Sequence, residues 1–581
     1  MPRYTKDHGR PRWRLGLGTL AIGFTLAGCE GGTILDPENG YGPTGAPGQP
    51  GDPSMPSGPG APPVTPSSSI PDVVDPGTGK ACITSAFTPA RIWRLSDEQY
   101  SAVVADLLPG VPVPGVTTPG RGKDEFLVTD DALPVSSALS ADIRVSAKAV
   151  AKQAIADLAK LTSCSSQDRA CADSFVTRFG ARAFRRPLTS EEKSGLLGLY
   201  DVGAKESHAE GLKLIVEAIL QTPSFLYRTE MGAGAADTKV IELTGYELAS
   251  SLSFYLLNSI PDAPLWQAAQ DGSLLKPEIL DAQINRLLAL PRVQENLTRV
   301  HLKWVGLGDG INVDLGSQFP DFTPELKQSL EEETRRFFSS LLTQEGTLAD
   351  VLTSRKGFVD QKLAAHYGVQ FPGGQGFAEV TYPANQRAGI VTQAAILARY
   401  SLGHPVVLRG KYVREQLLCG GINAPPNIPD IEEETTAAAN LTEREQSARR
   451  ASNATCNACH QMMDPLGLAF VQYDNLARWK PNDKNGQPLD ARGAISFTGD
   501  ADGPVDNAID MAKKLSESKA VRLCMAQQMY TFALGRELLT EDSCELQRID
   551  AYVKEHGGKL SQLVAGIVKS SAFRYRTGGK L

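Results

Sequence analysis

The segment Cys456-Asn457-Ala458-Cys459-His460 constrains this chain of 581 residues more than any other part of the sequence. Two thiols at this spacing can each bond to one vinyl group of a haem, which places the adjacent imidazole beneath the iron. The motif therefore predicts one covalently attached haem c. Cys456 and Cys459 are the expected attachment residues, and His460 is the expected proximal iron ligand.

The same five residues admit three other interpretations. They are a small disulfide followed by an incidental histidine, a redox-active pair of cysteines, and two ligands of a zinc site. A zinc site would be favoured by a second Cys-x-x-Cys pair or by a neighbouring pair of histidines, and the sequence has neither.

The amino terminus has the pattern of a bacterial lipoprotein signal. Basic residues between Arg3 and Arg14 precede a short apolar run that ends in Leu26-Ala27-Gly28-Cys29. This pattern predicts a signal peptide over residues 1–28, cleavage before Cys29 and lipidation of the Cys29 thiol. An uncleaved amino-terminal anchor is the alternative. No later segment is long and apolar enough to span a membrane.

These features predict an exported protein that is anchored by lipid to a bacterial membrane, at its periplasmic face or at the cell surface. The outer membrane is favoured, because Glu30 differs from the aspartate that retains some lipoproteins at the inner membrane. Pro, Gly and Ser dominate the residues that follow, so residues 29–80 are expected to form a disordered tether. The net charge of -7 argues against nucleic acid as a partner.

The nine cysteines need an explanation in an oxidising compartment. Lipid would take one and haem two, and the remaining six could form three disulfides. Connectivity is not fixed by the sequence, and free buried thiols are the alternative. The first pairings expected are Cys164 with Cys171, Cys524 with Cys544, and Cys82 with Cys419.

Periodicity from residue 90 onward predicts a mostly α-helical protein. Polar residues that cap helices precede several apolar runs. Ser96 and Thr244 each begin one, and Thr189 with Glu192 forms a capping box. Thr442 with Glu445 forms another, which predicts a helix leading towards Cys456.

One internal repeat is visible. Residues 213–229 resemble residues 561–577, with a Phe, a Tyr-Arg-Thr sequence and an upstream Arg in matching positions. We interpret the two segments as homologous helical hairpins whose aromatic ends pack inward. Only the second copy follows the Cys-x-x-Cys-His motif.

At the level of longer segments, the chain resembles the large secreted proteins of planctomycetes and myxobacteria that consist of consecutive modules of unknown function and carry a c-type cytochrome motif. The segments that carry the resemblance are RLSDEQYSAVVADLL, FGARAFRRPLTSEE, LTGYELASSLSFYLLNSIPD, CNACHQMMDPLGLAFVQYDNLARW and YTFALGREL. The resemblance implies a multi-module helical protein with a cytochrome c-like module near its carboxyl end. The expected modules are an amino-terminal one over 81–165, the first repeat copy over 166–235, a central one over 236–384, the haem-motif module over 385–503 and the second repeat copy over 504–581.

The sixth ligand of the iron is the least defined part of the expected site. A distal methionine usually follows the motif at some distance, and Met525 or Met529 lies at a suitable one, with Met511 in reserve. If no methionine binds, the sixth position is open or is taken by another histidine: His301, His366, His404 or His556. The residues from Asp464 to Gly467 are expected to form a turn, which is either an ordinary end of a helix or one whose backbone carbonyl accepts a hydrogen bond from Nδ1 of His460. Arg449, Arg450 and Arg478 are candidates to face the haem propionates, with plain solvation as the alternative.

The function expected from these features is electron transfer to or from an unknown redox partner protein. A haem-dependent oxidoreductase, or the electron-accepting subunit of one, is the first alternative. A surface scaffold or polysaccharide-binding lipoprotein without redox activity is the second. No catalytic residues are assigned, because the sequence contains no nucleophile elbow, zinc-protease helix, phosphate-binding loop or dinucleotide fingerprint.

Overall fold

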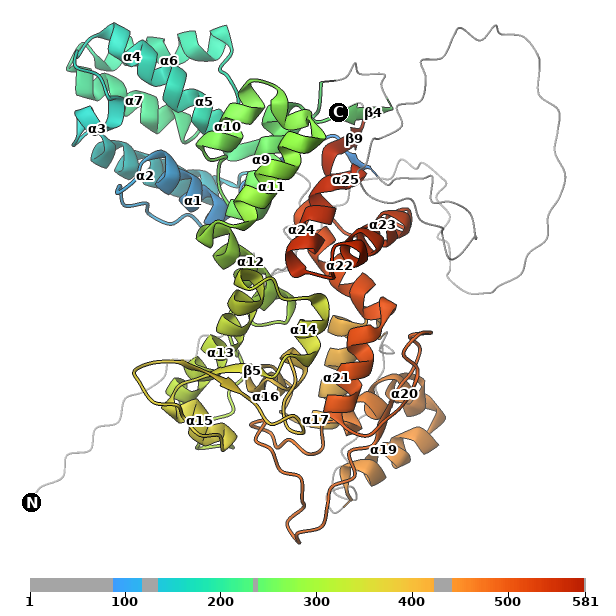
Figure 1. The fold of residues 1–581 in the computed structure, drawn as a ribbon. Helices are drawn as coiled ribbons and strands as arrows, with labels where there is room; N and C mark the ends of the chain where they lie inside the picture. The colour runs from blue at the N-terminus through green and yellow to red at the C-terminus, as the bar shows by residue number, and fades with distance from the viewer. Residues whose placement is uncertain (1–86, 118–133, 234–238, 423–440, 579–581) are drawn as a thin grey trace, which may run out of the picture. The chain divides into compact units, whose positions relative to one another are not determined.

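Helices make up most of the described chain, which confirms the fold class expected from the periodicity (Figure 1). The computed structural model describes residues 87–117, 134–233, 239–422 and 441–578. The expected signal peptide and tether, together with Cys29 and Cys82, lie outside these residues. Every described residue belongs to one compact unit.

The helices of the first half begin where capping residues stand in the sequence. Ser96 and Thr189 each accept a hydrogen bond from the backbone N–H three residues later and complete a capping box, as does Thr244. The helices up to residue 230 are α1 (Asp97–Leu107), α2 (Ser137–Ala154), α3 (Leu158–Thr162), α4 (Arg169–Phe175), the π-helical η1 (Val176–Gly180), α5 (Ala181–Phe184), α6 (Ser190–Gly203), α7 (His208–Ile219) and α8 (Pro223–Leu226).

The central and carboxyl-terminal helices follow the same rule in most cases, with Ser, Thr, Asp or Asn before the first turn. From residue 239 to residue 422 they are α9 (Gly245–Leu257), α10 (Ala263–Gln270), η2 (Ser273–Leu275), α11 (Pro277–Leu288), α12 (Pro291–Trp304), α13 (Pro324–Thr343), α14 (Leu348–Thr353), α15 (Gln361–Tyr367), η3 (Ile390–Thr392), α16 (Ala394–Arg399), α17 (Pro405–Tyr412) and the π-helical η4 (Val413–Leu417). From residue 441 they are α19 (Glu443–Ser452), α20 (Ala454–Leu468), α21 (Ala508–Glu517), α22 (Lys519–Leu534), α23 (Asp542–Glu555), α24 (Leu560–Lys569) and α25 (Ser571–Arg574).

Short strands join segments that are far apart in the sequence. The one three-stranded sheet in the described chain has the order β1-β9-β4, with β9 parallel to β1 and antiparallel to β4. Three antiparallel pairs are β2 with β3, β5 with β6, and β7 with β8. The strands are β1 (Thr88–Pro89), β2 (Arg91–Arg94), β3 (Tyr227–Glu230), β4 (Val240–Glu242), β5 (Lys356–Val359), β6 (Ala378–Thr381), β7 (Gly493–Ile495), β8 (Gly503–Val505) and β9 (Tyr575–Thr577).

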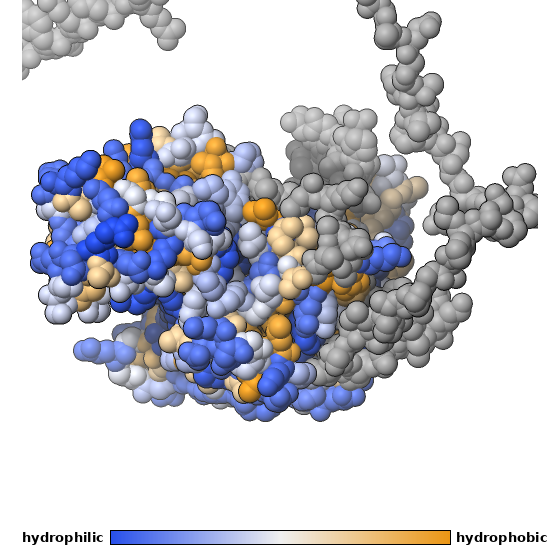
Figure 2. Space-filling view, turned by 90° about the horizontal axis from the view of Figure 1, so that it is seen from above, coloured by the Kyte–Doolittle hydropathy of each residue, from blue (hydrophilic) through white to orange (hydrophobic). Residues whose placement is uncertain are grey.

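The apolar side chains of the described residues form two hydrophobic cores. The first core runs from Leu95 to Leu226 and also takes in Phe254 and Ile260. The second core runs from Leu243 to Phe573 and includes side chains from α20, α21 and α22. The face seen in Figure 2 is mostly hydrophilic, with apolar residues in small separate patches, which is normal for a protein surface.

The two repeat copies have the same order of elements and the same internal ion pair. In the first copy α6, α7, α8 and β3 follow one another, and in the second α23, α24, α25 and β9 do so. Arg186 binds both carboxylate oxygens of Glu192 at 2.8 Å. Arg536 binds Asp542 in the same bidentate way at 2.6 and 2.8 Å. The structure thus supports the duplication inferred from the sequence.

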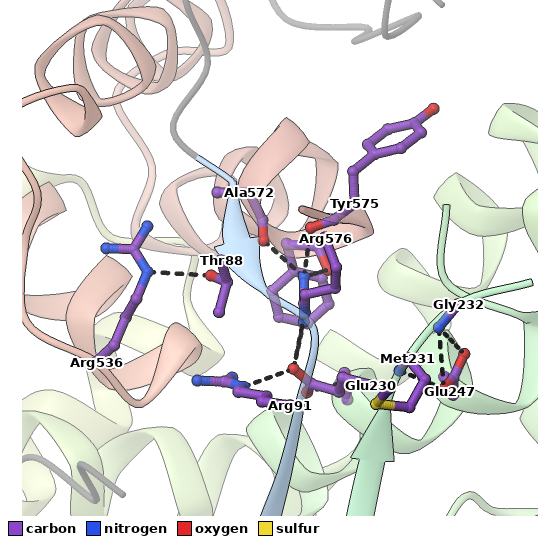
Figure 3. Close-up of polar contacts among 12 residues, drawn as sticks. Thr88, Arg91, Glu230, Met231, Gly232, Glu247, Arg536, Ala572, Tyr575 and Arg576 are labelled. Carbon is purple, nitrogen blue, oxygen red and sulfur yellow. Dashed lines mark hydrogen bonds and ion pairs between the residues drawn. The ribbon is translucent and has the colours of Figure 1, made fainter. Parts of the chain in front are cut away.

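A buried carboxylate joins the ends of the two copies. Glu230, in β3, accepts hydrogen bonds from Arg91 at 2.8 Å and from Nε and Nη2 of Arg576, in β9, at 2.9 and 2.6 Å (Figure 3). Its other oxygen accepts a hydrogen bond from Ser251 at 2.8 Å. Burial alone would raise the pKa of Glu230, but the charges of Arg576 and Arg91 outweigh burial and hold it well below its usual value. Glu230 therefore stays ionised in the folded protein.

The disulfides agree with the sequence-based pairings in one case of three. Cys164 pairs with Cys171 as expected. Cys524 pairs with Cys419, at a Cα–Cα distance of 5.4 Å, so the predicted pairings of Cys524 with Cys544 and of Cys82 with Cys419 are wrong. The physical reason is that α22 packs against η4, which brings Cys524 to the chain just after η4. Cys544 is disulfide-bonded as well.

Glycines allow α17 and α20 to touch backbone to backbone. A Cβ on Gly467 would overlap the carbonyl oxygen of Val406, and one on Gly410 would overlap that of Met463. These two contacts show that α20 runs antiparallel to α17. The close crossing fixes the orientation of the helix that carries the Cys-x-x-Cys-His motif.

We expect Glu230→Ala to destabilise the protein by about 3–5 kcal/mol, because it leaves buried arginines without their counter-charge. The measurement is the free energy of unfolding in urea. Asp201→Ala is the control, since Asp201 pairs with Arg169 at an exposed site and its loss should change little. Equal effects of the two changes would contradict the central role of Glu230.

Gly467→Ala should lower the free energy of unfolding by about 1–3 kcal/mol, because the added methyl group forces α17 and α20 apart. Gly198→Ala, in α6, is the matched control. Its Cβ would meet no heavy atom within 4 Å, so the helix propensity of alanine should leave stability unchanged or raise it by up to about 1 kcal/mol. Denaturation followed by circular dichroism compares the two, and similar outcomes would rule out the tight crossing.

Candidate functional site

The Cys-x-x-Cys-His motif lies at the beginning of α20. The side chain of Asn453 accepts hydrogen bonds from the backbone N–H of Thr455 at 3.0 Å and of Cys456 at 3.2 Å, and so starts this helix. The capping box at Thr442 forms as predicted, but its helix, α19, ends at Ser452. The motif is therefore carried on a second helix that packs against α19 (Figure 1).

Helix α20 presents the three motif side chains together. Cys456, Cys459 and His460 follow one another at intervals of three residues and one residue, so they share one face of the helix. All three are partly exposed. The two cysteines are not joined in a disulfide.

The imidazole of His460 is held by a carboxylate on the next turn of α20. Nδ1 of His460 lies 2.9 Å from Oδ1 of Asp464. An ionised carboxylate can only accept a hydrogen bond, so in the neutral ring Nδ1 carries the proton and Nε2 has the free lone pair. The predicted turn over residues 464–467 and its carbonyl partner are wrong, because α20 continues through Pro465 to Leu468.

Asp464 is also paired with a cation from α19. Its Oδ2 lies 2.8 Å from Nε of Arg450, and its side chain is almost fully buried. Burial alone would raise the pKa of Asp464, but the hydrogen bond with His460 and the charge of Arg450 together hold it below its usual value. The arrangement is an ordered row of imidazole, carboxylate and guanidinium.

Arg450 offers a further donor at this place. Its Nη2 is buried and, among the described residues, has no hydrogen-bond partner. A buried donor of this kind normally has an acceptor, and a carboxylate matches a guanidinium best. A porphyrin carries two propionate groups, so this unpaired donor fits the group that the motif predicts.

An exposed aromatic side chain lies on segments that pack against α20. Phe497 is 57% exposed and has a left-handed φ of 61°. Arg414, in η4, lies 5.7 Å from its ring and donates to the carbonyl of Ser496 at 3.0 Å. Both η4 and β7, which precedes Phe497, contact α20. A bulky residue rarely adopts this φ, and such strain is typical of binding sites.

The methionines considered as distal ligands are core residues. Met525 and Met529, both in α22, are 3% and 1% exposed and belong to the second hydrophobic core, as does Met511 in α21. Helix α22 packs mainly against α23 and α24, whereas α20 packs mainly against α17 and α19. The structure thus buries both methionines in packed core.

The four histidines considered as alternative ligands lie on other elements. His301 is buried and its Nδ1 lies 2.7 Å from the carbonyl oxygen of Leu297. Burial lowers its pKa to about 4, so it is neutral at physiological pH. The remaining three are His366 in α15, His404 before α17 and His556 after α23.

Sequence reasoning did not foresee the contacts of two residues of the site, Asp464 and Arg450. Asp464 stands four residues after His460, and this spacing on a helix would have identified it once the helix was known to continue. The pairing of Arg450 with Asp464 gives no such signal, because Arg450 comes from a separate helix. Only the packing of α19 on α20 brings it to Asp464.

Two searches of the described residues are negative. No group of three or more His, Cys, Asp and Glu side chains in this part of the chain is arranged to hold a metal ion. No helix among the same residues combines the length and the apolar character that crossing a membrane requires.

Four family models match consecutive parts of the chain. Three are described as Protein of unknown function (DUF1595), (DUF1592) and (DUF1585), and they match residues 171–230, 243–369 and 502–573. The fourth, PSCyt3, Protein of unknown function (DUF1588), matches residues 387–483, which include the Cys-x-x-Cys-His motif. The comparison with curated proteins finds no match, and neither does the comparison with solved structures. The family matches show that the chain belongs to the planctomycete cytochrome c-like family of multi-module proteins of unknown function.

Proposed function

We propose that this chain is an exported, lipid-anchored c-type haem protein that transfers electrons. The observation that carries the proposal is the geometry of α20, where Cys456, Cys459 and His460 share one face and Asp464 holds the proton on Nδ1 of His460. This arrangement leaves the lone pair of Nε2 for a metal.

Attachment needs no oxidant. The sulfur of Cys456 would bond to one carbon of a vinyl group, and the thiol proton would end on the other vinyl carbon. Cys459 would hold the second vinyl group in the same way. Both thiols are partly exposed, so they are accessible for this addition.

When bound, the haem supplies a one-electron couple between ferric and ferrous iron. The chain's own residues prepare the site for it: His460 offers Nε2, Asp464 orients the ring, and Arg450 offers a buried donor to a propionate. The partner that gives or takes the electron is a second redox protein.

The lipid anchor rests on the sequence Leu26-Ala27-Gly28-Cys29 after a basic and apolar leader. We propose that cleavage before Cys29 and lipidation of its thiol attach the protein to a bacterial membrane, with the outer membrane favoured by Glu30.

A haem-dependent oxidoreductase, or its electron-accepting subunit, is the second candidate. It is favoured by the burial of Met525 and Met529 in packed core on α22, which packs mainly against α23 and α24. The absorption spectrum separates the candidates: an electron carrier should be low-spin and inert to added cyanide, whereas an enzyme with an exchangeable sixth position should be high-spin and should bind it.

The double change Cys456→Ala with Cys459→Ala should abolish covalent haem, because both sites of thioether formation are lost. The measurements are the pyridine haemochrome spectrum and haem staining of denatured protein after maturation by a c-haem assembly system. Cys164→Ala with Cys171→Ala is the control, since it also removes two cysteines, which form a disulfide, but should keep the haem. Retention of stain in the first variant, or a colourless wild-type protein, would refute the proposal and favour a scaffold without redox activity.

Cys29→Ala should abolish incorporation of labelled palmitate and shift the protein out of the detergent phase on phase separation. Cys82→Ala should do neither, although it removes a cysteine from the same end of the chain. Equal labelling of both variants would exclude Cys29 as the lipidation site.

A further inference from the structure

We propose that Asp464 and Arg450 set the reduction potential of the haem bound through His460, with opposite effects. This inference rests on the function proposed above and assigns a role to two side chains that neither the motif nor the family matches identify. Asp464 is a positioning residue, because it acts through the imidazole ring, whereas Arg450 acts through Asp464 and through its own charge.

The contacts are fixed by the fold. Asp464 follows His460 by one helical turn, so α20 itself sets the distance of 2.9 Å between Oδ1 and Nδ1. Arg450 reaches Oδ2 at 2.8 Å from α19. Asp464 is only 2% exposed, so little water can screen these charges.

The chemical effect of Asp464 follows from its charge. A carboxylate that accepts the Nδ1 proton raises the basicity of the imidazole, and a more basic ligand favours the more highly charged ferric iron. A neutral backbone carbonyl in the same place would raise the basicity of the imidazole less than a carboxylate does. Asp464 therefore lowers the potential at which the site accepts an electron.

Arg450 opposes this effect. Its positive charge, 2.8 Å from Oδ2, draws negative charge of Asp464 away from the imidazole. A cation near the iron also disfavours the ferric state directly. The potential is thus a balance between two side chains of opposite charge.

The test is an equilibrium redox titration of mature holoprotein. Asp464→Asn should raise the reduction potential, and Arg450→Gln should lower it. Each change should alter the equilibrium constant for reduction of the haem tenfold or more, which is about 59 mV for a one-electron couple. Arg449→Gln is the matched control, because it removes the same charge from an exposed neighbouring position on α19 and should shift the potential much less.

Opposite signs separate charge effects from structural damage, since damage to the site would move both variants in the same direction. Shifts of the same sign, or no shift beyond that of Arg449→Gln, would overturn the inference. If Asp464→Asn does not accumulate as holoprotein, Arg450→Lys takes its place: this change keeps the positive charge and should retain most of the potential that Arg450→Gln loses, and an equal loss in both would overturn the inference. Absence of covalent haem in the wild-type protein would instead refute the proposed function, so the two failures are distinguishable.

Discussion

The buried carboxylate of Glu230 is the interaction on which the assembly of the two repeat copies depends. It lies in β3, at the end of the first copy, and binds Arg576 in β9, at the end of the second. Arg91 adds a third element, β2, to the same carboxylate. Ionic contacts of this kind are stable in a buried place only when every partner is present, so the ends of both copies must fold together.

The two copies show how duplication can separate scaffold from function. Both keep the arginine that clamps a carboxylate six residues later. They differ in what precedes them. Helices η4 and α20 come before the second copy, and among the residues that the structure describes no counterpart of α20 comes before the first. The disulfide between Cys419 and Cys524 joins the second copy to the segment that follows η4. The second copy therefore supports the helix that carries the motif.

Sequence reasoning succeeded where the decisive interaction is local. Capping residues such as Thr189 and Thr442 satisfy backbone groups within their own first turn, so the helix starts could be predicted from the sequence. The reasoning failed where distant segments meet. Cys524 was assigned to the wrong partner because only the packing of α22 on η4 decides the pair. Pro465 suggested a turn, yet the helix continues through it for three more residues, and this error concealed Asp464.

The positions of the cysteines have a consequence for biogenesis. Cys419 and Cys524 form a bond across a separation of 105 residues, and Cys456 and Cys459 lie between them without joining it. A secreted chain that emerges from its amino terminus exposes Cys419 first, then Cys456 and Cys459, and Cys524 last. An oxidising catalyst that acted in this order would meet Cys456 and Cys459 before Cys524 and would join Cys419 to one of them. Correct maturation therefore requires that the thiols of Cys456 and Cys459 be kept reduced, or be bonded to another group, before Cys419 and Cys524 form their disulfide. The cell must supply reductant and oxidant to one polypeptide in a defined order.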